Sequence, residues 1–362
     1  MSNNLSVYTT IFTRMRQLLP KQRITQVRNL ALLMTGLVLA RSVHLDHISN
    51  KLPLKAKIPS LSNRLRRFLS NTRFCIKTCY APVAQALLAR FAQVELVFIL
   101  DTTQLGRHHR LLTVSLAYRG RAFPLWFSVH RGKKGHVKVS HAIRLLEEIR
   151  PWLPHQQVQV LGDSAFGEVE LIKQLSLWHW AYVLRVKGHY SVAREGIDWH
   201  RLMDLGLKPG QSRWLGAVHL TKKHNFVGCY VAMHWAKGED EPWYLVSSLG
   251  SWQPVLRAYR KRMWTEELYG DLKGHGFNLE ATRLDSVLRL ERLVLAVSLV
   301  YVWLLAFGSW VVKNGYRHYV DRRDRRDKSY FRIGWDWLER QLRLEHPFRL
   351  EHPFRVIFQP YL

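Results

Sequence analysis

VELVFILDTT, at residues 94–103, is the stretch that decides the fold of this 362-residue chain. Its β-branched and aromatic residues favour a strand, and the polar residues after Leu100 mark the end of the apolar run. We therefore expect a strand that delivers the carboxylate of Asp101 to one edge of a sheet.

Strand and helix patterns alternate after this run. Two more strand patterns come first, then a helical stretch that stops before Pro151, a strand that runs into Asp163, a second helix and a further strand. The five strand patterns are VELVFIL at 94–100, LLTVSLAY at 111–118, AFPLWFSVH at 122–130, VQVLG at 158–162 and AYVLRVK at 181–187. This order is typical of an RNase H-like fold, with an acidic residue at the end of the first and fourth strands.

The charge balance favours a polyanionic partner such as nucleic acid. The chain has 55 Lys and Arg against 27 Asp and Glu, a formal net charge of +28. Residues 1–94 hold fifteen Lys and Arg and a single carboxylate, Asp46. Within them Arg64, Arg66 and Arg67 form a basic helix face that suits phosphate contacts, with a solvated face as the alternative. The regional charge bias favours DNA binding.

Composition and pattern divide the chain into five regions. Residues 188–250 change to short β-like pieces rich in Trp, Gly and His, and a helical pattern resumes near Gln253. We predict an α/β protein with an RNase H-like mixed-sheet catalytic core, a β-rich insertion, an N-terminal helical domain and a helical C-terminal region. The predicted regions are a basic helical DNA-binding domain at 1–90, the first part of the core at 91–187, the insertion at 188–250, the second part of the core with the catalytic helix at 251–312, and a charged tail at 313–362.

One segment, LVLAVSLVYVWLLAFGSWVV at 293–312, is uncharged and long enough to span a bilayer. Basic residues flank both of its ends, so it carries no clear orientation, and no second span of that length accompanies it. We therefore expect a buried core helix and no membrane association.

The three cysteines, Cys75, Cys79 and Cys229, provide neither a disulfide framework nor the spacing of a zinc site. The start of the chain shows no export pattern. We expect three core thiols in a reducing cytosol.

The segment YRKRMWTEELYGDLK at 259–273 carries a polar stripe. Tyr259, Arg262, Glu266 and Lys273 are separated by steps of three, four and seven, which share one face of a helix at about 100° per residue. A surface stripe of ion-paired residues is the simpler explanation for the stripe by itself. Two strand-end aspartates reverse that preference, because a helical glutamate can complete an acidic triad with Asp101 and Asp163.

This spacing resembles the YREK signature of DDE insertion-sequence transposases of the IS-four group. The DTT after the first strand and the D-x-x-F of DSAF at 163–166 resemble that family's first two catalytic regions, so the similarity covers about residues 60–312. The resemblance implies an RNase H-like core with a β insertion between Asp163 and Glu266. It also implies a cut-and-paste DNA transposase that cleaves element ends and transfers a 3′-hydroxyl to target DNA.

Phosphodiester cleavage requires an activated water and a stabilised leaving oxygen, which two metal ions about 3.5–4 Å apart provide. Carboxylates without His or Cys ligands suit Mg²⁺ or Mn²⁺. We therefore assign Asp101, Asp163 and Glu266 as the catalytic residues and as the ligands of two such ions.

Further residues are candidates for DNA contacts. Arg262 and Lys273 are placed to bind phosphates, and Tyr259 to orient one. By resemblance, Trp243 lies where some family members stack a flipped base during hairpin formation, with a strand-core Trp as an equal alternative. Arg185 and Lys187 alternate along a strand near Asp163 and are expected to contact DNA.

Two more features carry smaller expectations. Glu267 departs from the stripe, so we expect it to be exposed to solvent, and the turn at Lys133 and Lys134 suits a phosphate. The partners implied are terminal inverted repeats and target DNA, with a homodimer assembled on paired ends in the bacterial cytoplasm at the nucleoid. The alternative is a catalytically degenerate DNA-binding protein derived from a transposase.

Overall fold

The computed structural model of this chain describes residues 3–91, 94–118, 120–132, 137–153, 157–195 and 198–344. They divide into two compact units. The sheet unit comprises the described parts of 93–103 and 110–268, and the helical unit those of 1–92, 104–109 and 269–362. The phosphate-binding turn predicted at Lys133 and Lys134 lies outside the described residues.

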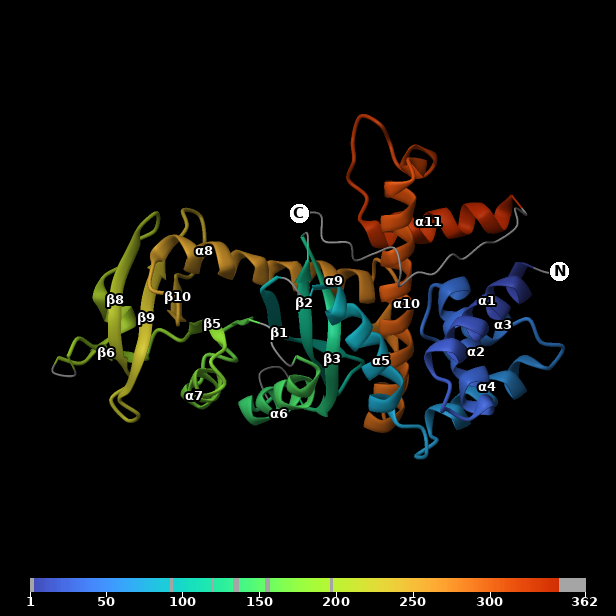
Figure 1. Ribbon diagram of the computed structural model, residues 1–362, viewed down its shortest axis with the longest axis horizontal. Coiled ribbons are helices and arrows are strands. Elements are labelled where there is room, and N and C mark those ends of the chain that lie inside the picture. The colour runs from blue at the N-terminus through green and yellow to red at the C-terminus, as the bar shows by residue number, and fades with distance from the viewer. Residues whose placement is uncertain are drawn as a thin grey trace. The chain divides into compact units, whose positions relative to one another are not determined.

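The sheet unit is built on one ten-stranded sheet in the order β3-β2-β1-β4-β5-β10-β9-β8-β6-β7 (Figure 1). Strands β1, β4 and β5 are parallel neighbours, whereas β5, β10, β9 and β8 pair antiparallel. The strands span Leu96–Leu105 (β1), His109–Tyr118 (β2), Arg121–Arg131 (β3), Val158–Gly162 (β4), Ala181–Val186 (β5), Ser191–Ala193 (β6), His200–Arg201 (β7), Ser212–Leu220 (β8), Phe226–His234 (β9) and Trp243–Ser247 (β10).

The predicted order of three strands, a helix, a strand, a helix and a strand is confirmed. The end of β1 was predicted wrongly, because the strand continues through Asp101 to Leu105. Only its pairing with β4 stops near the aspartate, at Leu100 opposite Gly162. The strand itself continues because β1 and β2 are joined by a tight turn that comes only after Leu105.

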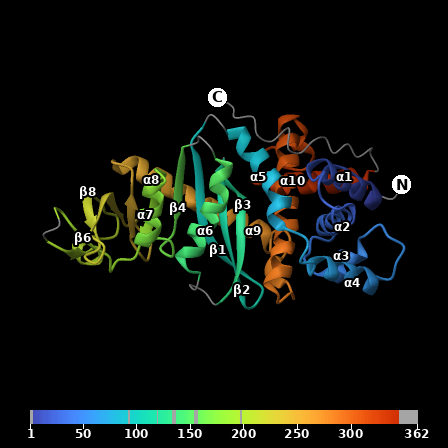
Figure 2. The same ribbon diagram turned by 60° about the horizontal axis from the view of Figure 1, so that its bottom comes forward.

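Helices cover both faces of this sheet. Helices α6 (Val139–Ile149) and α7 (Val169–Leu177) lie on one face, and α8 (Trp252–Arg260) lies on the other (Figures 1 and 2). Helix α6 buries its side chains at steps of three and four residues, which is the apolar stripe that a helix needs to pack on a sheet. After α8, a 3₁₀ turn at Lys261–Met263 leads into α9 (Trp264–Leu272).

The region predicted as a β-rich insertion extends the same sheet. Strand β10 pairs with β5 in the register Leu245 to Arg185, and β9, β8, β6 and β7 follow outward from it. Residues 188–250 therefore share hydrogen bonds with the strands that precede them. The boundaries at 188 and 250 stay a prediction.

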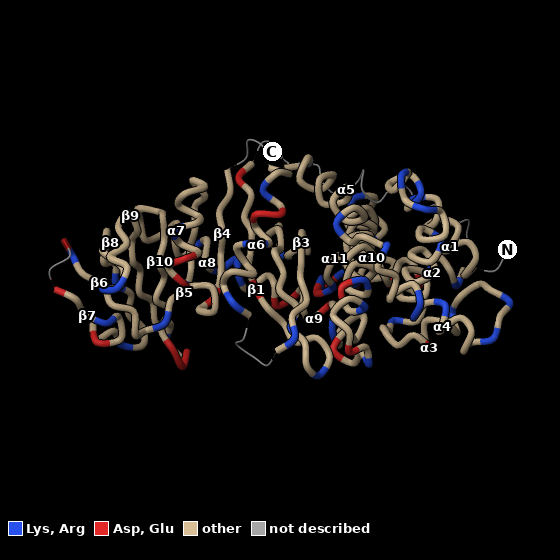
Figure 3. The backbone as a smooth tube through the Cα atoms, turned by 90° about the horizontal axis from the view of Figure 1, so that it is seen from below, with Lys and Arg blue, Asp and Glu red and all other residues tan. Residues whose placement is uncertain are grey.

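The helical unit contains the basic N-terminal helices. They are α1 (Asn3–Leu18), α2 (Ile24–Ala40), α3 (Leu45–Asn50), α4 (Ile58–Leu69) and α5 (Ile76–Leu88). Figure 3 shows Lys and Arg distributed along them. The interpretation of all three cysteines as core thiols is wrong for Cys75, which is exposed at the residue before α5, while Cys79 and Cys229 are buried.

Helix α10 (Val287–Lys313) contains the long apolar segment. By length and composition it is able to cross a membrane, since its most apolar window has a mean hydropathy of 2.1. Yet 89% of that window is buried, and α2, α4, α5 and α11 pack against it. This burial favours the interpretation as a core helix.

The region predicted as a charged tail contains a further packed helix, α11 (Tyr330–Arg343). Phe331, Trp335 and Leu338 are buried on its apolar face, and α11 packs against α10. The two backbones cross closely at Gly308 and Gly334, where a Cβ would collide with carbonyl oxygens of the other helix. The sequence prediction missed this helix because it relied on the many charged residues of the region, and the outer face of α11 is strongly polar. Residues 345–362 lie outside the described residues.

Arg292 fastens the end of α4 to α10. Its side chain is buried, at 3% exposure, and its guanidinium donates to the carbonyls of Asn71 at 2.8 Å and Phe74 at 2.9 Å. A third hydrogen bond, to the carbonyl of Leu288 at 2.8 Å, lies within α10. These three backbone acceptors offset part of the cost of burying the charge, while the buried Nε of Arg292 has no hydrogen-bond partner among the described residues.

We expect Arg292→Met to lower the free energy of unfolding by about 2–4 kcal/mol, because the buried carbonyl of Phe74 and the partly buried carbonyl of Asn71 lose their donor. Urea denaturation followed by circular dichroism measures this. Arg289→Met is the matched control, since Arg289 is only partly buried and donates to the Ser70 hydroxyl at 2.8 Å. An equal loss in both variants contradicts the anchoring role.

Candidate active site

Two aspartates lie side by side where the pairing of β1 with β4 ends. Asp101 is the β1 residue just after the last paired residue, and Asp163 directly follows β4. The last registered pair of these parallel strands is Leu100 opposite Gly162, so Asp101 and Asp163 occupy the next position on each. Neighbouring strands are about 4.8 Å apart, which brings the two carboxylates within strong electrostatic reach. Both of the sequence-predicted aspartates are therefore on one edge of the sheet.

Burial dominates the chemistry of Asp101. Its residue is 7% exposed, and burial raises the pKa of its carboxyl from 3.8 to about 6. The hydrogen bond from Thr265 and the charge of Arg262 partly offset this rise, whereas the negative charge of Asp163 adds to it. Burial thus outweighs both the hydrogen bond and the positive charge of Arg262, so the charged form of the carboxyl is disfavoured.

Thr265 and Arg262 both reach Asp101 from the 261–272 segment. The Thr265 hydroxyl, on a fully buried residue, lies 2.7 Å from Oδ2 of Asp101, and Nη1 of Arg262 lies 3.4 Å from the same oxygen. The backbone N–H of Thr102 donates to Oδ1 at 2.7 Å. These contacts fix the orientation of the carboxylate.

The continuous helix predicted over 259–273 is wrong. Tyr259 lies in α8, Arg262 in the 3₁₀ turn and Glu266 in the first turn of α9, while Lys273 follows the end of α9. At the turn, the Thr265 hydroxyl also lies 2.9 Å from the carbonyl of Arg262, a side-chain contact that competes with regular helical hydrogen bonding. The spacing of residues in the sequence does not predict this contact between Thr265 and the carbonyl of Arg262.

Arg262 bridges two of the predicted catalytic carboxylates. Its Nη2 lies 3.2 Å from Oε1 of Glu266, one helical turn away, and its Nη1 contacts Asp101. The Arg262 side chain is 16% exposed, whereas that of Glu266 is 56% exposed. The guanidinium therefore supplies the positive charge nearest to the acidic pair.

An aromatic pair borders this cluster. The ring of Tyr259, on a residue 2% exposed, lies 4.9 Å from that of Trp243 in an edge-to-face arrangement. Burial raises the pKa of Tyr259 to about 12, so its hydroxyl stays protonated at neutral pH. The structure places half-buried Trp243, at the start of β10, beside Tyr259.

Other predicted contact residues have partners of their own. Arg185 pairs with Glu241 at 2.8 Å, and Lys187 is exposed just beyond β5. Lys273 pairs with Glu280 at 3.4 Å in the helical unit.

Glu267 is 59% exposed, as expected, and pairs with Arg121 at 2.6 Å. Arg64, Arg66 and Arg67 lie on α4 in the helical unit.

Among the described residues, no three His, Cys, Asp or Glu side chains are grouped so as to hold a metal ion. The donor chemistry of Asp101 and Asp163 fits a hard divalent cation, because these are neighbouring oxygen donors whose repulsion a cation would relieve. Glu266 contacts the guanidinium of Arg262 instead. For Glu266 to become a third ligand, it must exchange this arginine for the cation.

Thr265 is the site residue that sequence reasoning missed. Threonine is common, and nothing in its type distinguishes it within TEEL at 265–268. The available signal was its position directly before Glu266, in a segment already assigned to the site.

A family model for the transposase DDE domain matches residues 93–303, more than half of the chain. A comparison with curated proteins found no match. Among solved structures, a cryo-EM structure of the piggyBac transposase synaptic complex with hairpin DNA aligns at 11% identity and a TM-score of 0.45, over 96% of this chain and 81% of that chain. The family match includes Asp101, Asp163 and Glu266, and with it the chain belongs to the transposase DDE domain family.

Proposed function

We propose that this member of the transposase family is the cut-and-paste transposase of an insertion sequence, of the IS-four group with its YREK signature. The observation that carries the proposal is the adjacent pair Asp101 and Asp163, with Arg262 and Glu266 brought to it from a distant segment. Each of these residues lies within the stretch that the family model matches.

The strand arrangement supports an RNase H-like core. Strands β3, β2, β1, β4 and β5 are neighbours in that order, and β1, β4 and β5 run parallel with α6 and α7 as their connections. The acidic pair follows the β1–β4 pairing, at the carboxyl ends of parallel strands, where α/β sheets commonly bind ligands.

Asp101, Asp163 and Glu266 would hold two Mg²⁺ or Mn²⁺ ions. Such ions, when bound, lower the pKa of a coordinated water and stabilise the leaving oxygen of a phosphodiester. The chain's own contribution is to hold Asp101 rigidly, through Thr265, with its charged form disfavoured until a cation arrives.

Arg262 would bind a phosphate next to the scissile bond. Its guanidinium is a planar fork that matches phosphate as well as carboxylate, so a DNA phosphate can replace Glu266 as its partner. This exchange would free Glu266 for metal binding when the substrate is present. Lys273 would provide a second phosphate contact.

Half-buried Trp243 would stack a displaced base, with buried Tyr259 supporting it from behind. The edge-to-face contact with Tyr259 would hold the indole ring in place, and stacking of a base on an aromatic ring tolerates any sequence. A hairpin intermediate is part of this proposal. Arg185 and Lys187, near this pair on β5 and just after it, would contact the DNA backbone.

The DNA partners would be terminal inverted repeats and a target site, in the bacterial cytoplasm at the nucleoid. Two ends must be cut together, so the active form would be a homodimer on paired ends. The N-terminal region 1–90, with its excess of Lys and Arg, would bind DNA in addition to the catalytic core.

A second candidate, a catalytically degenerate DNA-binding descendant of a transposase, is favoured by one observation. The three acidic side chains do not form a metal-holding group among the described residues. The experiments below separate the two functions.

Asp101→Asn and Glu266→Gln should each abolish Mg²⁺-dependent cleavage of DNA that carries the element ends, while duplex binding stays within about two-fold of wild type, because each change removes one carboxylate from a strongly basic chain. Gel assays of cleavage and of binding measure both effects. Glu267→Gln is the control and should cleave normally. Wild-type protein that binds DNA but never cleaves it, with Mg²⁺ or Mn²⁺, would point to the degenerate descendant.

The stability of the metal-free protein should depend on Asp101 in a defined pH range. Because its folded-state pKa is raised from 3.8 to about 6, the folded state binds the proton more tightly, and stability falls as pH rises from about 4 to about 6. Metal-free Asp101→Asn should therefore be more stable than wild type at neutral pH, by up to about 3 kcal/mol, and this gain should vanish near pH 4. Thermal unfolding in chelator at a series of pH values measures this.

The same thermal unfolding with Mg²⁺ provides the metal test. Mg²⁺ should raise the Tm of wild type and leave that of Asp101→Asn unchanged, because the ligand charge is lost. An equal rise in both proteins argues against Asp101 as a ligand.

Thr265→Val should reduce cleavage roughly 10-fold, the usual effect of removing a group that orients a metal ligand. Because the hydroxyl lowers the pKa of Asp101, its loss should also move the acidic limb of the pH–rate profile to higher pH. Thr265→Ser, which retains the hydroxyl, should restore both the rate and the profile. A slower enzyme with an unchanged profile in Thr265→Val would indicate a packing role only.

A further inference from the structure

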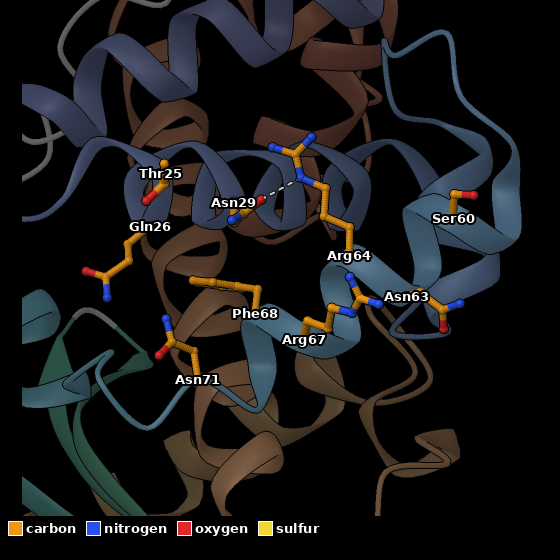
Figure 4. Close-up of a pocket in the computed structure, with 9 residues that line it drawn as sticks. All are labelled: Thr25, Gln26, Asn29, Ser60, Asn63, Arg64, Arg67, Phe68 and Asn71. Carbon is orange, nitrogen blue, oxygen red and sulfur yellow. Dashed lines mark hydrogen bonds between the residues drawn. The ribbon is translucent and has the colours of Figure 1, made fainter.

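Helices α2 and α4 border a polar cavity of about 590 Å³ in the helical unit (Figure 4). Its lining consists of two arginines, four side-chain amides, two hydroxyls and the ring of Phe68, and it includes no carboxylate. A cavity with donors on every side and no negative charge favours an anionic ligand that also carries hydrogen-bonding groups.

Arg64 is held in position across this groove. Its Nε donates to Oδ1 of Asn29 on α2 at 2.8 Å, which orients the side chain toward the opposite helix (Figure 4). That bond uses one edge of the guanidinium, and the two terminal nitrogens remain as donors. Among the described residues, neither Arg64 nor Arg67 forms an ion pair with a carboxylate. The groove therefore presents positive charge that the protein does not neutralise.

The three arginines of α4 differ in their placement. Arg64 and Arg67 are three residues apart, share one helix face and line the groove. Arg66 projects from a different face, does not line the cavity, and donates to Asn63 at 2.7 Å. The basic helix face predicted from the sequence is therefore divided: Arg64 and Arg67 line the groove, and Arg66 lies outside it.

Amides complete the groove. Gln26 and Asn29 come from α2, Asn63 from α4, and Asn71 follows the end of α4. Gln26 is 6% exposed and donates to the carbonyl of Arg73 at 3.3 Å, so it supports the wall of the groove. The Oδ1 atoms of Asn29 and Asn71 accept from Arg64 and from the backbone N–H of Arg73, which leaves their amide N–H groups as donors for a ligand. Arg292 fixes the carbonyl of Asn71 to α10 at 2.8 Å, so this end of the groove has a rigid support.

We propose that the α2–α4 groove is a DNA-contact site in which Arg64 and Arg67 bind backbone phosphates and the side-chain amide groups of Asn29 and Asn71 donate to the bound nucleotides. The choice of DNA rests on the proposed function. Phosphate is the ligand chemistry that the two arginines recognise, and the polar cavity beyond them has room for more than a free phosphate.

The test measures binding of the full-length chain to a fluorescently labelled, random-sequence DNA duplex in chelator, so that cleavage does not interfere. Arg64→Gln and Arg67→Gln should each weaken binding roughly ten-fold, the effect of losing a charge-assisted hydrogen bond. Each should also lower the slope of log affinity against log salt by about one. Arg66→Gln carries the same change of charge on the same helix and should stay within about two-fold of wild type.

Asn29→Asp is a second variant that leaves both arginines in place. It adds a negative charge inside the groove next to Arg64, so binding should fall at least as much as in Arg64→Gln. Circular dichroism and thermal unfolding of each variant establish that it is folded.

Three outcomes would contradict the proposal that the α2–α4 groove binds DNA. An equal loss of DNA affinity in the three arginine variants would indicate general electrostatic attraction. Displacement of the duplex by inorganic phosphate at the same molar concentration as the duplex would indicate a pocket for small anions. Tighter binding of an RNA duplex than of the DNA duplex would also exclude it. Wild-type protein that binds no DNA at all would instead count against the proposed function.

Discussion

Parallel pairing of β1 with β4 is the constraint on which the rest of the site depends. The register Leu100 opposite Gly162 leaves Asp101 and Asp163 as neighbours, one of them almost fully buried. Two adjacent carboxylates in such a place repel each other and lose hydration, so the fold must supply a proton, a cation or hydrogen-bond donors. Thr265 and Arg262 are the donors that it supplies from the far end of the sheet unit's sequence.

Those donors explain why the 259–273 segment departs from a regular helix. A single straight helix can present a stripe, but Arg262 contacts Asp101 and Glu266 from a 3₁₀ turn, where the chain is wound more tightly. A second constraint is the pairing of β10 with β5, which holds β10 in the sheet and so places Trp243 beside Tyr259. The insertion is therefore part of the same structural framework that positions the acidic pair.

The sequence allowed the five strands β1–β5 and both aspartates to be predicted, because apolar runs of strand length bounded by polar residues depend on local chemistry alone. It did not allow prediction of the pairing partner of β10, since pairing is decided by contacts between residues far apart in the chain. Helix α11 was missed for a related reason: its buried face is recognisable only once α10 is present to cover it. The role of Thr265 likewise depends on a contact with a residue 164 positions away.

The surroundings of two arginines, one in each unit, differ in charge. Arg262 lies among carboxylates, so its charge is already partly used, and a phosphate has to compete with Glu266 for it. Arg64 is oriented by an amide, which directs the guanidinium without neutralising it, so an incoming anion meets the full charge. A net charge of +28 by itself predicts attraction to any polyanion. Under the proposals above, Arg262 would exchange a carboxylate for a phosphate, whereas Arg64 would bind a phosphate without giving up an ion pair.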